Sequence, residues 1–200
     1  MKRIVFLSTM ALALTLSVGS ISAQKDSILH RVPKQISIEF GYRNVFSVID
    51  RSANPFVNSA SNGYGFLVDY AWKLSGLSGK KPGIYLSVPI GYSVMLPDNN
   101  TSKSISMLNY GWTIRHELSV NKPITPFLGY GLLLNTLTLE GTAGGVMGHQ
   151  TKFEFGANLN TKTRLKYFAK VEYSYTSYPK LGDSKRIHFQ YLDFRVGARF

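Results

Sequence analysis

The stretch YLDFRVGARF at residues 191–200 alternates between apolar and polar side chains. Apolar residues occupy every second position, whereas charges of both signs and one glycine occupy the positions between them. Because successive side chains of a β-strand point to opposite faces, this period of two predicts a strand with one apolar and one charged face. The apolar positions are Leu192, Phe194, Val196, Ala198 and Phe200.

Seven further stretches alternate in the same way, and clusters of Gly, Asn, Ser, Pro and Lys separate them. Each stretch reaches the roughly 9–11 residues that a tilted strand needs to cross a membrane. No segment shows the 3.6-residue period of a helix. We therefore predict eight strands, at residues 34–45, 63–73, 83–96, 105–118, 124–136, 151–160, 164–177 and 187–200.

Alternation alone does not decide which face is inside, because a soluble lipocalin-like barrel and a membrane barrel exchange the two faces. Three observations favour the membrane arrangement. The apolar face carries more rings than an eight-stranded interior can hold, the polar face carries the glycines that a narrow interior requires, and both signs of charge lie on that face and can pair. The predicted fold is therefore all-β: a closed, antiparallel, up-and-down transmembrane β-barrel of eight strands.

The polar face then forms a network of paired charges inside the barrel, because an unpaired buried charge is costly. On the lipid face, each Arg or Lys near the midplane would cost about 2–4 kcal/mol instead. An eight-stranded interior is just wide enough for side chains to fill it, so we expect no large channel. The predicted network comprises Glu39, Arg43, Asp69, Lys73, Arg115, Glu117, Lys152, Glu154, Lys170, Glu172, Asp193, Arg195 and Arg199.

The beginning of the chain predicts export. Two basic residues at positions 2 and 3 precede an apolar run from Ile4 to Val18, and small residues follow it, which is typical of a secretory signal peptide. The run is shorter than the roughly 20 residues of a membrane-spanning helix. We expect cleavage after Ala23, a periplasmic lead-in at residues 24–33 and a barrel domain at residues 34–200.

The composition limits the kinds of partner and of binding site that the chain is expected to have. The chain has no cysteine, which excludes disulfides and thiolate metal sites. Its net charge of +12 would suggest nucleic acid in a soluble protein. An exported chain meets anionic lipid and lipopolysaccharide instead, so we expect outer-membrane lipid and lipopolysaccharide as partners and no nucleic acid.

The histidines do not indicate a metal or cofactor site, because no two of them have ligand spacing and no acidic cluster lies in a loop. His188 follows Asp183 and Ser184 only in sequence, and a catalytic triad requires hydrogen-bond reach. His149 shares a predicted loop with Glu140. We therefore expect no catalytic, cofactor or metal site. The alternative is a lipid-acting barrel enzyme with His188 or His149 as the base.

The last strand resembles the C-terminal signal by which the barrel-assembly machinery recognises outer-membrane proteins, with Phe194, Val196, Ala198 and the terminal Phe200 as its apolar positions. Residues 85–92 are similar to an "x-x-I-P-L" strand, and residues 123–131 to an "x-P-Y-x-G-x-G" strand, of outer-membrane barrel domains. The mature chain thus resembles the small outer-membrane β-barrel families, of the OmpA and OmpX type in size. This resemblance implies an outer-membrane location and the barrel-assembly machinery as a partner.

An even number of strands with both termini in the periplasm fixes the topology. The predicted extracellular loops are residues 46–62, 97–104, 137–150 and 178–186. Pro89 cannot donate a ladder hydrogen bond, so we expect a bulge or a missing bond there.

These loops carry nearly balanced charge and could bind a host surface, another envelope protein or lipopolysaccharide phosphate. The sequence does not rank these roles. The preferred hypothesis is a non-enzymatic barrel with an envelope-structural or surface-interaction role. A small transport or secretion-accessory barrel is a further alternative.

Overall fold

The computed structural model describes residues 34–49, 62–75, 82–97, 103–119, 122–141, 144–161, 165–179 and 186–200. The predicted signal peptide (residues 1–23) and lead-in (residues 24–33) lie outside the described residues. In the described part of the chain, no helix is long and apolar enough to cross a membrane. The strands are β1 (Lys34–Ile49), β2 (Gly63–Ser75), β3 (Ile84–Met95), β4 (Ile105–Glu117), β5 (Ile124–Leu139), β6 (Val146–Asn160), β7 (Lys166–Tyr178) and β8 (Ile187–Arg199).

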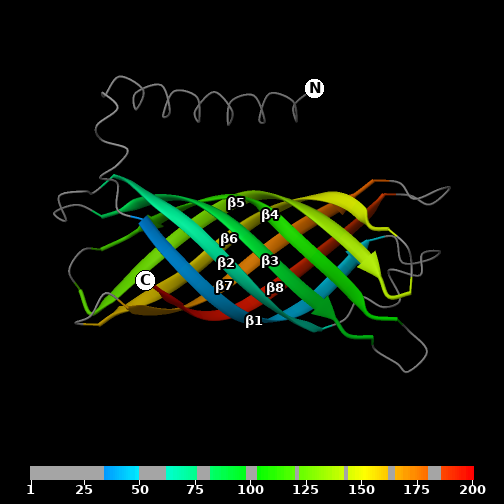
Figure 1. The fold of residues 1–200 in the computed structure, drawn as a ribbon, viewed down its shortest axis with the longest axis horizontal. Helices are drawn as coiled ribbons and strands as arrows, with labels where there is room; N and C mark the ends of the chain where they lie inside the picture. Colours follow the sequence, from blue (N-terminus) through cyan, green and yellow to red (C-terminus); the bar gives the residue numbers. More distant parts are fainter. Residues whose placement is uncertain are drawn as a thin grey trace, which may run out of the picture. The chain divides into compact units, whose positions relative to one another are not determined.

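Each strand pairs antiparallel with the next one, and β8 pairs with β1, so the sheet closes into an eight-stranded up-and-down barrel (Figure 1). The predicted fold is confirmed. Closure leaves no strand edge unpaired, which a sheet in lipid requires. We call the end where β1 begins and β8 ends the terminal end, and the opposite end the loop end.

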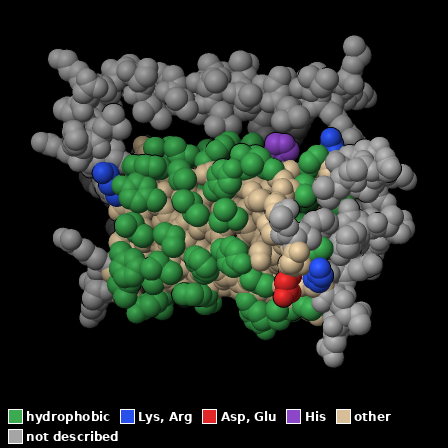
Figure 2. Space-filling view, turned by 45° about the vertical axis from the view of Figure 1, so that its right-hand side comes forward, with side chains coloured by type: hydrophobic (Ala, Val, Ile, Leu, Met, Phe, Trp, Pro, Cys, Tyr) green, Lys and Arg blue, Asp and Glu red, His purple; other side chains and the backbone are tan. Residues whose placement is uncertain are grey.

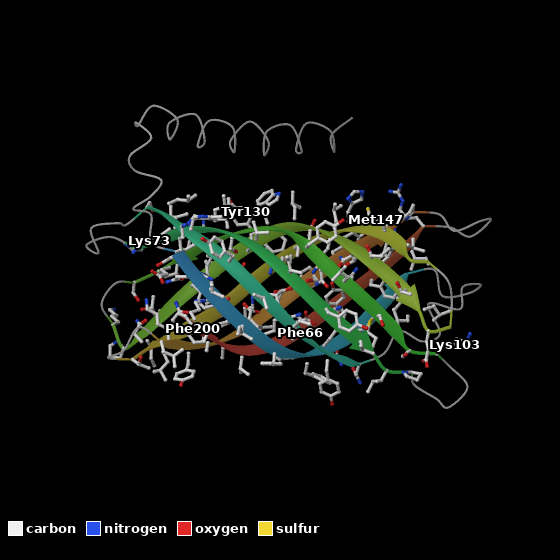
Figure 3. The ribbon with its side chains drawn as sticks, in the orientation of Figure 1. Phe66, Lys73, Lys103, Tyr130, Met147 and Phe200 are labelled. Carbon is white, nitrogen blue, oxygen red and sulfur yellow. The ribbon has the colours of Figure 1, made fainter. Side chains whose placement is uncertain are left out.

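Apolar side chains cover the outside of the barrel. Figure 2 shows them across the middle of one face, while the charged side chains that are visible lie at its two ends. In Figure 3, Lys73 and Lys103 mark opposite ends of the barrel, and Phe66 and Phe200 project outward between them. Phe66 is 47% exposed and Phe200 60% exposed, as expected for side chains that face lipid.

The regular ladders are interrupted at three places. Between β3 and β4 the pairing stops after Ser87 and resumes in the same register at Ile90, so the residues on either side of the gap keep their alignment. The gap contains Pro89, and the prediction of a missing bond there is confirmed. The register shifts near the loop end between Val45 and Ser47, where β1 meets β8, and at the terminal end of β2.

The prediction of a loop at residues 137–150 is wrong. β5 continues to Leu139 and β6 already begins at Val146, so only a short turn joins them. Gly141 and Gly144 have φ angles of 76° and 95° in this turn, a conformation that glycine adopts without steric cost. The polar residues and the glycines of this segment suggested a loop, but they continue the inward and outward alternation of the strands.

Candidate functional site

The barrel interior holds most of the predicted charge network. Eleven of the thirteen predicted residues are buried, and the remaining two, Lys73 and Glu117, are half-buried at the terminal end. The interior contains four groups of side chains: a lysine–carboxylate centre, an arginine–aspartate cluster at the seam between β1 and β8, an arginine layer near the terminal end and an apolar cluster at the loop end.

Lys170 lies at the middle of the lysine–carboxylate centre. Its Nζ atom lies 2.9 Å from a Glu39 oxygen, 2.8 Å from Glu154 and 3.5 Å from Glu172. Lys152 lies 3.1 Å from Glu172 and 3.5 Å from Glu154. Two lysines therefore share three carboxylates drawn from β1, β6 and β7, which satisfies the requirement that buried charges be paired.

A second cluster spans the seam where β8 closes onto β1. Arg43 binds Asp193 through two bonds, from Nε at 2.7 Å and from Nη2 at 2.9 Å. Arg195 donates a further bond of 2.7 Å to the same carboxylate. The Arg43 guanidinium also lies 3.9 Å from the ring centre of Tyr191 and donates to Ser93. The bidentate geometry and the ring contact fix the position of the arginine.

Near the terminal end, two arginines pack on rings. The Arg199 guanidinium lies 4.0 Å from the ring centre of Phe168 and 4.9 Å from that of Phe127. Arg115 lies 4.8 Å from the ring centre of Tyr85. Arg115 has an ion-pair distance of 4.0 Å to Asp69, whereas the described contacts of Arg199 include no ion pair. Cation–π contacts thus replace part of the ionic pairing expected from the sequence.

The sequence reasoning missed an apolar cluster inside the loop end, which we call the apolar plug. Its inward positions continue those of the polar face: Met107 has the parity of Asn109, and Phe189 has that of Asp193. The signal was a reversed alternation at the loop ends of β5 and β8, where the inward residues are apolar and the outward residues, such as Thr138 and His188, are polar. The plug consists of Met95, Ile105, Met107, Leu137, Leu139, Tyr178, Ile187, Phe189 and Tyr191.

The candidate catalytic histidines lie on the outside of the barrel. His149 is on β6 and not in a loop, which corrects the prediction, and His188 is on β8. Ser177 of β7 pairs with His149 on one side and with His188 on the other. The described contacts include no hydrogen bond from Ser177 to either histidine; His188 Nδ1 instead lies 2.7 Å from the hydroxyl of Tyr175.

Other predicted partners of these histidines are not brought together. Asp183 and Ser184 lie outside the described residues. Glu140, at the turn after β5, accepts bonds from the Ser104 hydroxyl at 2.7 Å and from the Ser104 N–H at 3.1 Å. These two donors hold the pKa of Glu140 below its usual value. Among the described residues, no three side chains of metal-ligating type form a group.

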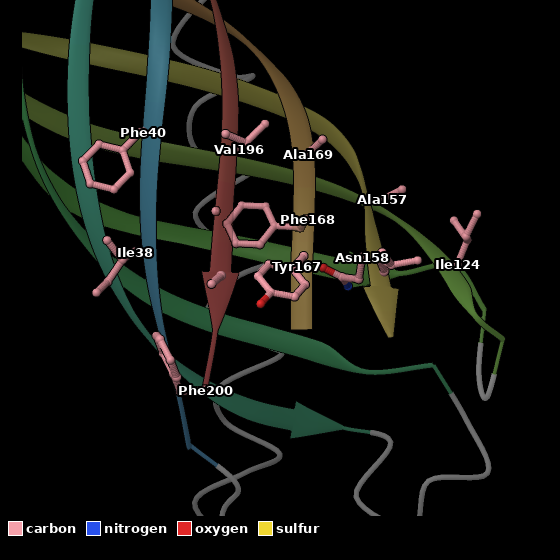
Figure 4. A pocket seen from close by; sticks show the side chains of 13 residues that line it. Ile38, Phe40, Ile124, Ala157, Asn158, Tyr167, Phe168, Ala169, Val196 and Phe200 are labelled. Atoms are coloured by element: carbon pink, nitrogen blue, oxygen red, sulfur yellow. The ribbon is translucent and has the colours of Figure 1, made fainter. Parts of the chain in front are cut away.

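The predicted assembly signal lies along the outer wall of β8. Phe194, Val196 and Phe200 are 50%, 61% and 60% exposed, and Ala198 is half-buried. The N–H of Phe200 donates to the carbonyl oxygen of Ile36 at 2.9 Å, so the last residue is bound to β1. Figure 4 shows Val196 and Phe200 beside an apolar groove that crosses from β6 to β1.

Comparison with known proteins gives one family. The outer membrane protein beta-barrel domain family matches residues 11–200. Among curated proteins, none has significant similarity to the sequence.

The fold is similar to that of Neisserial surface protein A, with a TM-score of 0.59 and 12% identity over 83% of this chain and 95% of that one. OprG from Pseudomonas aeruginosa has a TM-score of 0.48 and 11% identity, covering 84% of this chain and 95% of its own. Ail of Yersinia pestis, in complex with the heparin analogue sucrose octasulfate, has a TM-score of 0.47 and 14% identity, covering 84% and 99%. At 12% identity, the likeness to Neisserial surface protein A shows a shared fold.

Proposed function

The chain belongs to the outer membrane protein beta-barrel domain family, and from this premise we propose that it is a non-enzymatic barrel with an envelope-structural or surface-interaction role. The filled interior carries this proposal. The ion network occupies the middle of the barrel and the apolar plug occupies the loop end. An interior filled by its own side chains leaves the outer wall and the loop-end connections as the surfaces that can meet other molecules.

The proposal is tested by shortening the connections at the loop end one at a time, between β1 and β2, β3 and β4, and β7 and β8. Each variant is first checked for a heat-dependent shift in gel mobility, which reports a closed barrel. We expect at least one folded variant to lose cell adhesion or envelope integrity to the extent that deletion of the whole protein does. Unchanged adhesion and integrity in every folded variant would reject the role.

A lipid-acting enzyme is the second candidate, because the ladder places Ser177 between His149 and His188 on the outer wall. A serine beside a histidine can act as a nucleophile when the histidine removes its proton. If this candidate is correct, the lipid A mass spectrum of cells will change when the protein is expressed, and Ser177→Ala will abolish the change. Identical spectra with and without the protein would support the non-enzymatic proposal.

We also propose that the outer wall of β8 is recognised by the barrel-assembly machinery. The alternating apolar side chains that end at Phe200 support this role, because they remain accessible on the outside of the strand. Outer-membrane lipid and lipopolysaccharide are the proposed surroundings of the apolar belt, and a surface or envelope protein is the proposed partner of the loops.

A further inference from the structure

The outward side chains of β6, β7 and β8 change abruptly from polar to apolar along the barrel axis. The two rows of paired residues nearest the loop end are polar, and the two rows below them are apolar; on β6 the exposed Met147 lies beyond the polar rows. We call the polar rows the polar block; they comprise His149, Ser177 and His188 in the first row and Thr151, Tyr175 and Gln190 in the second. The apolar rows comprise Phe153, Tyr173 and Leu192, followed by Phe155, Val171 and Phe194.

The wall formed by β3 and β4 does not show this change from two polar rows to two apolar rows. At the same distance from the loop end, the outward residues of β3 are Tyr92 and Val94, and those of β4 are Ser106 and Leu108. There the Tyr92 hydroxyl donates to Ser106 at 2.9 Å. Polar outward residues also occur at the loop end of β4 and β5, where Ser106 pairs with Thr138, but among the described residues the histidines near the loop end lie on β6 and β8.

The polar block suits an anionic group. The acidic residues of β6, β7 and β8 are Glu154, Glu172 and Asp193, and all three are buried inside the barrel. The outward wall of these strands thus carries two histidines and no carboxylate, and the exposed Arg186 directly precedes β8. Imidazole, guanidinium and hydroxyl groups are all donors to phosphate oxygens.

One histidine of the polar block is held in place. The Tyr175 hydroxyl lies 2.7 Å from His188 Nδ1, and the two rings stack at 5.4 Å between their centres. With Nδ1 engaged by Tyr175, the Nε2 atom is the ring nitrogen that can donate to a ligand. A donor whose ring is already oriented loses less entropy when it binds.

An apolar hollow lies directly below the polar block on the same wall. Its lining includes Phe153, Phe155, Val171, Tyr173 and Leu192, together with Leu128 and Tyr130 of β5 and His116 of β4. These side chains belong to the outer belt that faces the hydrocarbon of the membrane. A hollow of this kind accommodates an acyl chain, and the polar block lies at the end of the hollow where the head group of that lipid would be.

We propose that the wall formed by β6, β7 and β8 binds one phosphorylated lipid of the membrane leaflet at the loop end. The polar block holds its phosphate through His149 and His188, and the apolar hollow holds one of its acyl chains. Tyr175 is a positioning residue that orients His188. This site does not depend on the role of the loops, so its test is separate from the loop-shortening experiment.

The experiment measures lipid retention by native mass spectrometry on the intact protein in detergent. The probes are dioleoyl phosphatidic acid and dioleoylglycerol, which have the same acyl chains and differ by the phosphate. We expect one molecule of phosphatidic acid to bind at least about tenfold more tightly than the diacylglycerol, because hydrogen bonds to a charged group are stronger than those to a neutral one. Equal retention of the two lipids would overturn the proposal.

Variants then locate the site. The double substitution His149→Gln with His188→Gln is expected to reduce phosphatidic acid binding about tenfold, and Tyr175→Phe about threefold, while diacylglycerol binding stays unchanged. Tyr92→Phe is the matched control, because it removes a hydroxyl contact from the opposite wall. An equal loss in Tyr92→Phe, or no loss in the histidine variant, would contradict the site. Displacement of the lipid by inorganic phosphate alone at millimolar concentration would show that the acyl chain is not required and would also reject the lipid site.

Discussion

Lys170 shows how the interior depends on single residues. It is the one described side chain with an ion pair to each of Glu39, Glu154 and Glu172. Burial deprives these carboxylates of water, so each requires a cation or a donor nearby. Loss of one lysine therefore leaves more than one negative charge without sufficient compensation.

We predict that Lys170→Met destabilises the barrel by about 3–5 kcal/mol, the range for breaking a buried ion pair from one side. The measurement is urea unfolding followed by tryptophan fluorescence in detergent. Adding Glu39→Gln to Lys170→Met is expected to restore part of the loss, because it removes one unpaired charge. Lys103→Met at the exposed loop end is the control and should change stability by less than about 0.5 kcal/mol. A Lys170→Met protein as stable as the control would contradict the role of the network.

Glu140 gives a pH-dependent contact outside the membrane belt. Its pKa is lowered by the bonds from Ser104, so its ionised form is favoured in the folded protein. A lowered folded-state pKa means that this contact contributes above the ordinary glutamate pKa and is lost as the pH falls through the lowered value. We expect the protection factor of the Ser104 N–H, which corrects for the intrinsic pH dependence of amide exchange, to fall in acid, and Glu140→Gln to remove this pH dependence of the protection. Exchange that is equally pH-dependent in both proteins would rule out Glu140 as the cause.

At the scale of the strand, β8 combines three properties that were visible in its sequence. Its alternation indicated a β-strand, and its charged residues indicated the face that points into the barrel. Phe200 is a terminal aromatic residue on the outer face. In the structure the strand ends at Arg199, and Phe200 is still bonded to β1. The strand is therefore both a part of the wall and the segment that we propose the assembly machinery recognises.

Deletion of Phe200 is expected to lower the amount of assembled barrel in cells by about fivefold or more, while refolding of the purified chain in detergent is reduced far less. The reason is that recognition in the cell requires the terminal aromatic, whereas refolding requires mainly the ladder contacts, worth about 1 kcal/mol each. Phe66→Ala removes a ring of similar exposure from β2 and serves as the control. Equal losses in cells for both variants would show that Phe200 acts as an ordinary lipid-facing residue.

The strands could be predicted where the two faces differ strongly. The predicted limits of β3, β4 and β8 fall within one residue of the observed ones at both ends. The β5–β6 hairpin was predicted too short because its outward residues, such as Thr136 and His149, are polar beyond the membrane belt. A polar outward face and a glycine-rich sequence together remove the contrast on which the period of two depends.

The candidate site was predictable to a similar degree. Charges on the polar face were placed inside by the alternation together with the many rings on the apolar face and the glycines on the polar face. The apolar plug was missed because the alternation reverses near the loop end: there the inward residues are apolar and the outward residues, such as Thr138 and His188, are polar, so an apolar side chain no longer marks the lipid face. The polar block was missed because it brings together His149, Ser177 and His188 from three strands, and only the register between strands makes them neighbours.

At the scale of the whole molecule, the ion network and the apolar plug fill the interior in succession. Ions that cross the barrel would have to displace paired charges and then apolar rings, which is costly at both steps. The barrel is thus expected to have a closed interior and to act through its outer surfaces.

We predict that the purified protein gives no stable single-channel current of porin size in planar lipid bilayers. The double substitution Phe189→Ala with Tyr191→Ala removes two rings of the plug but leaves the ion pairs in place, and we expect it to remain closed. A large porin of known conductance, added to the same bilayer, verifies that the assay detects an open channel. Steady currents from the unmodified protein would contradict a filled interior.

The seam between β1 and β8 also favours one register of strand pairing when the barrel closes. Arg43 faces Asp193 only when the first and last strands meet in the observed register. A slip of two residues in one direction would place Arg43 opposite Arg195, so a positive charge would meet a positive charge instead of its carboxylate. A chain whose last strand pairs with β1 in the wrong register therefore cannot close the barrel at low free energy. The same bond that holds the finished barrel together distinguishes a correct closure from a faulty one at the final step of biogenesis.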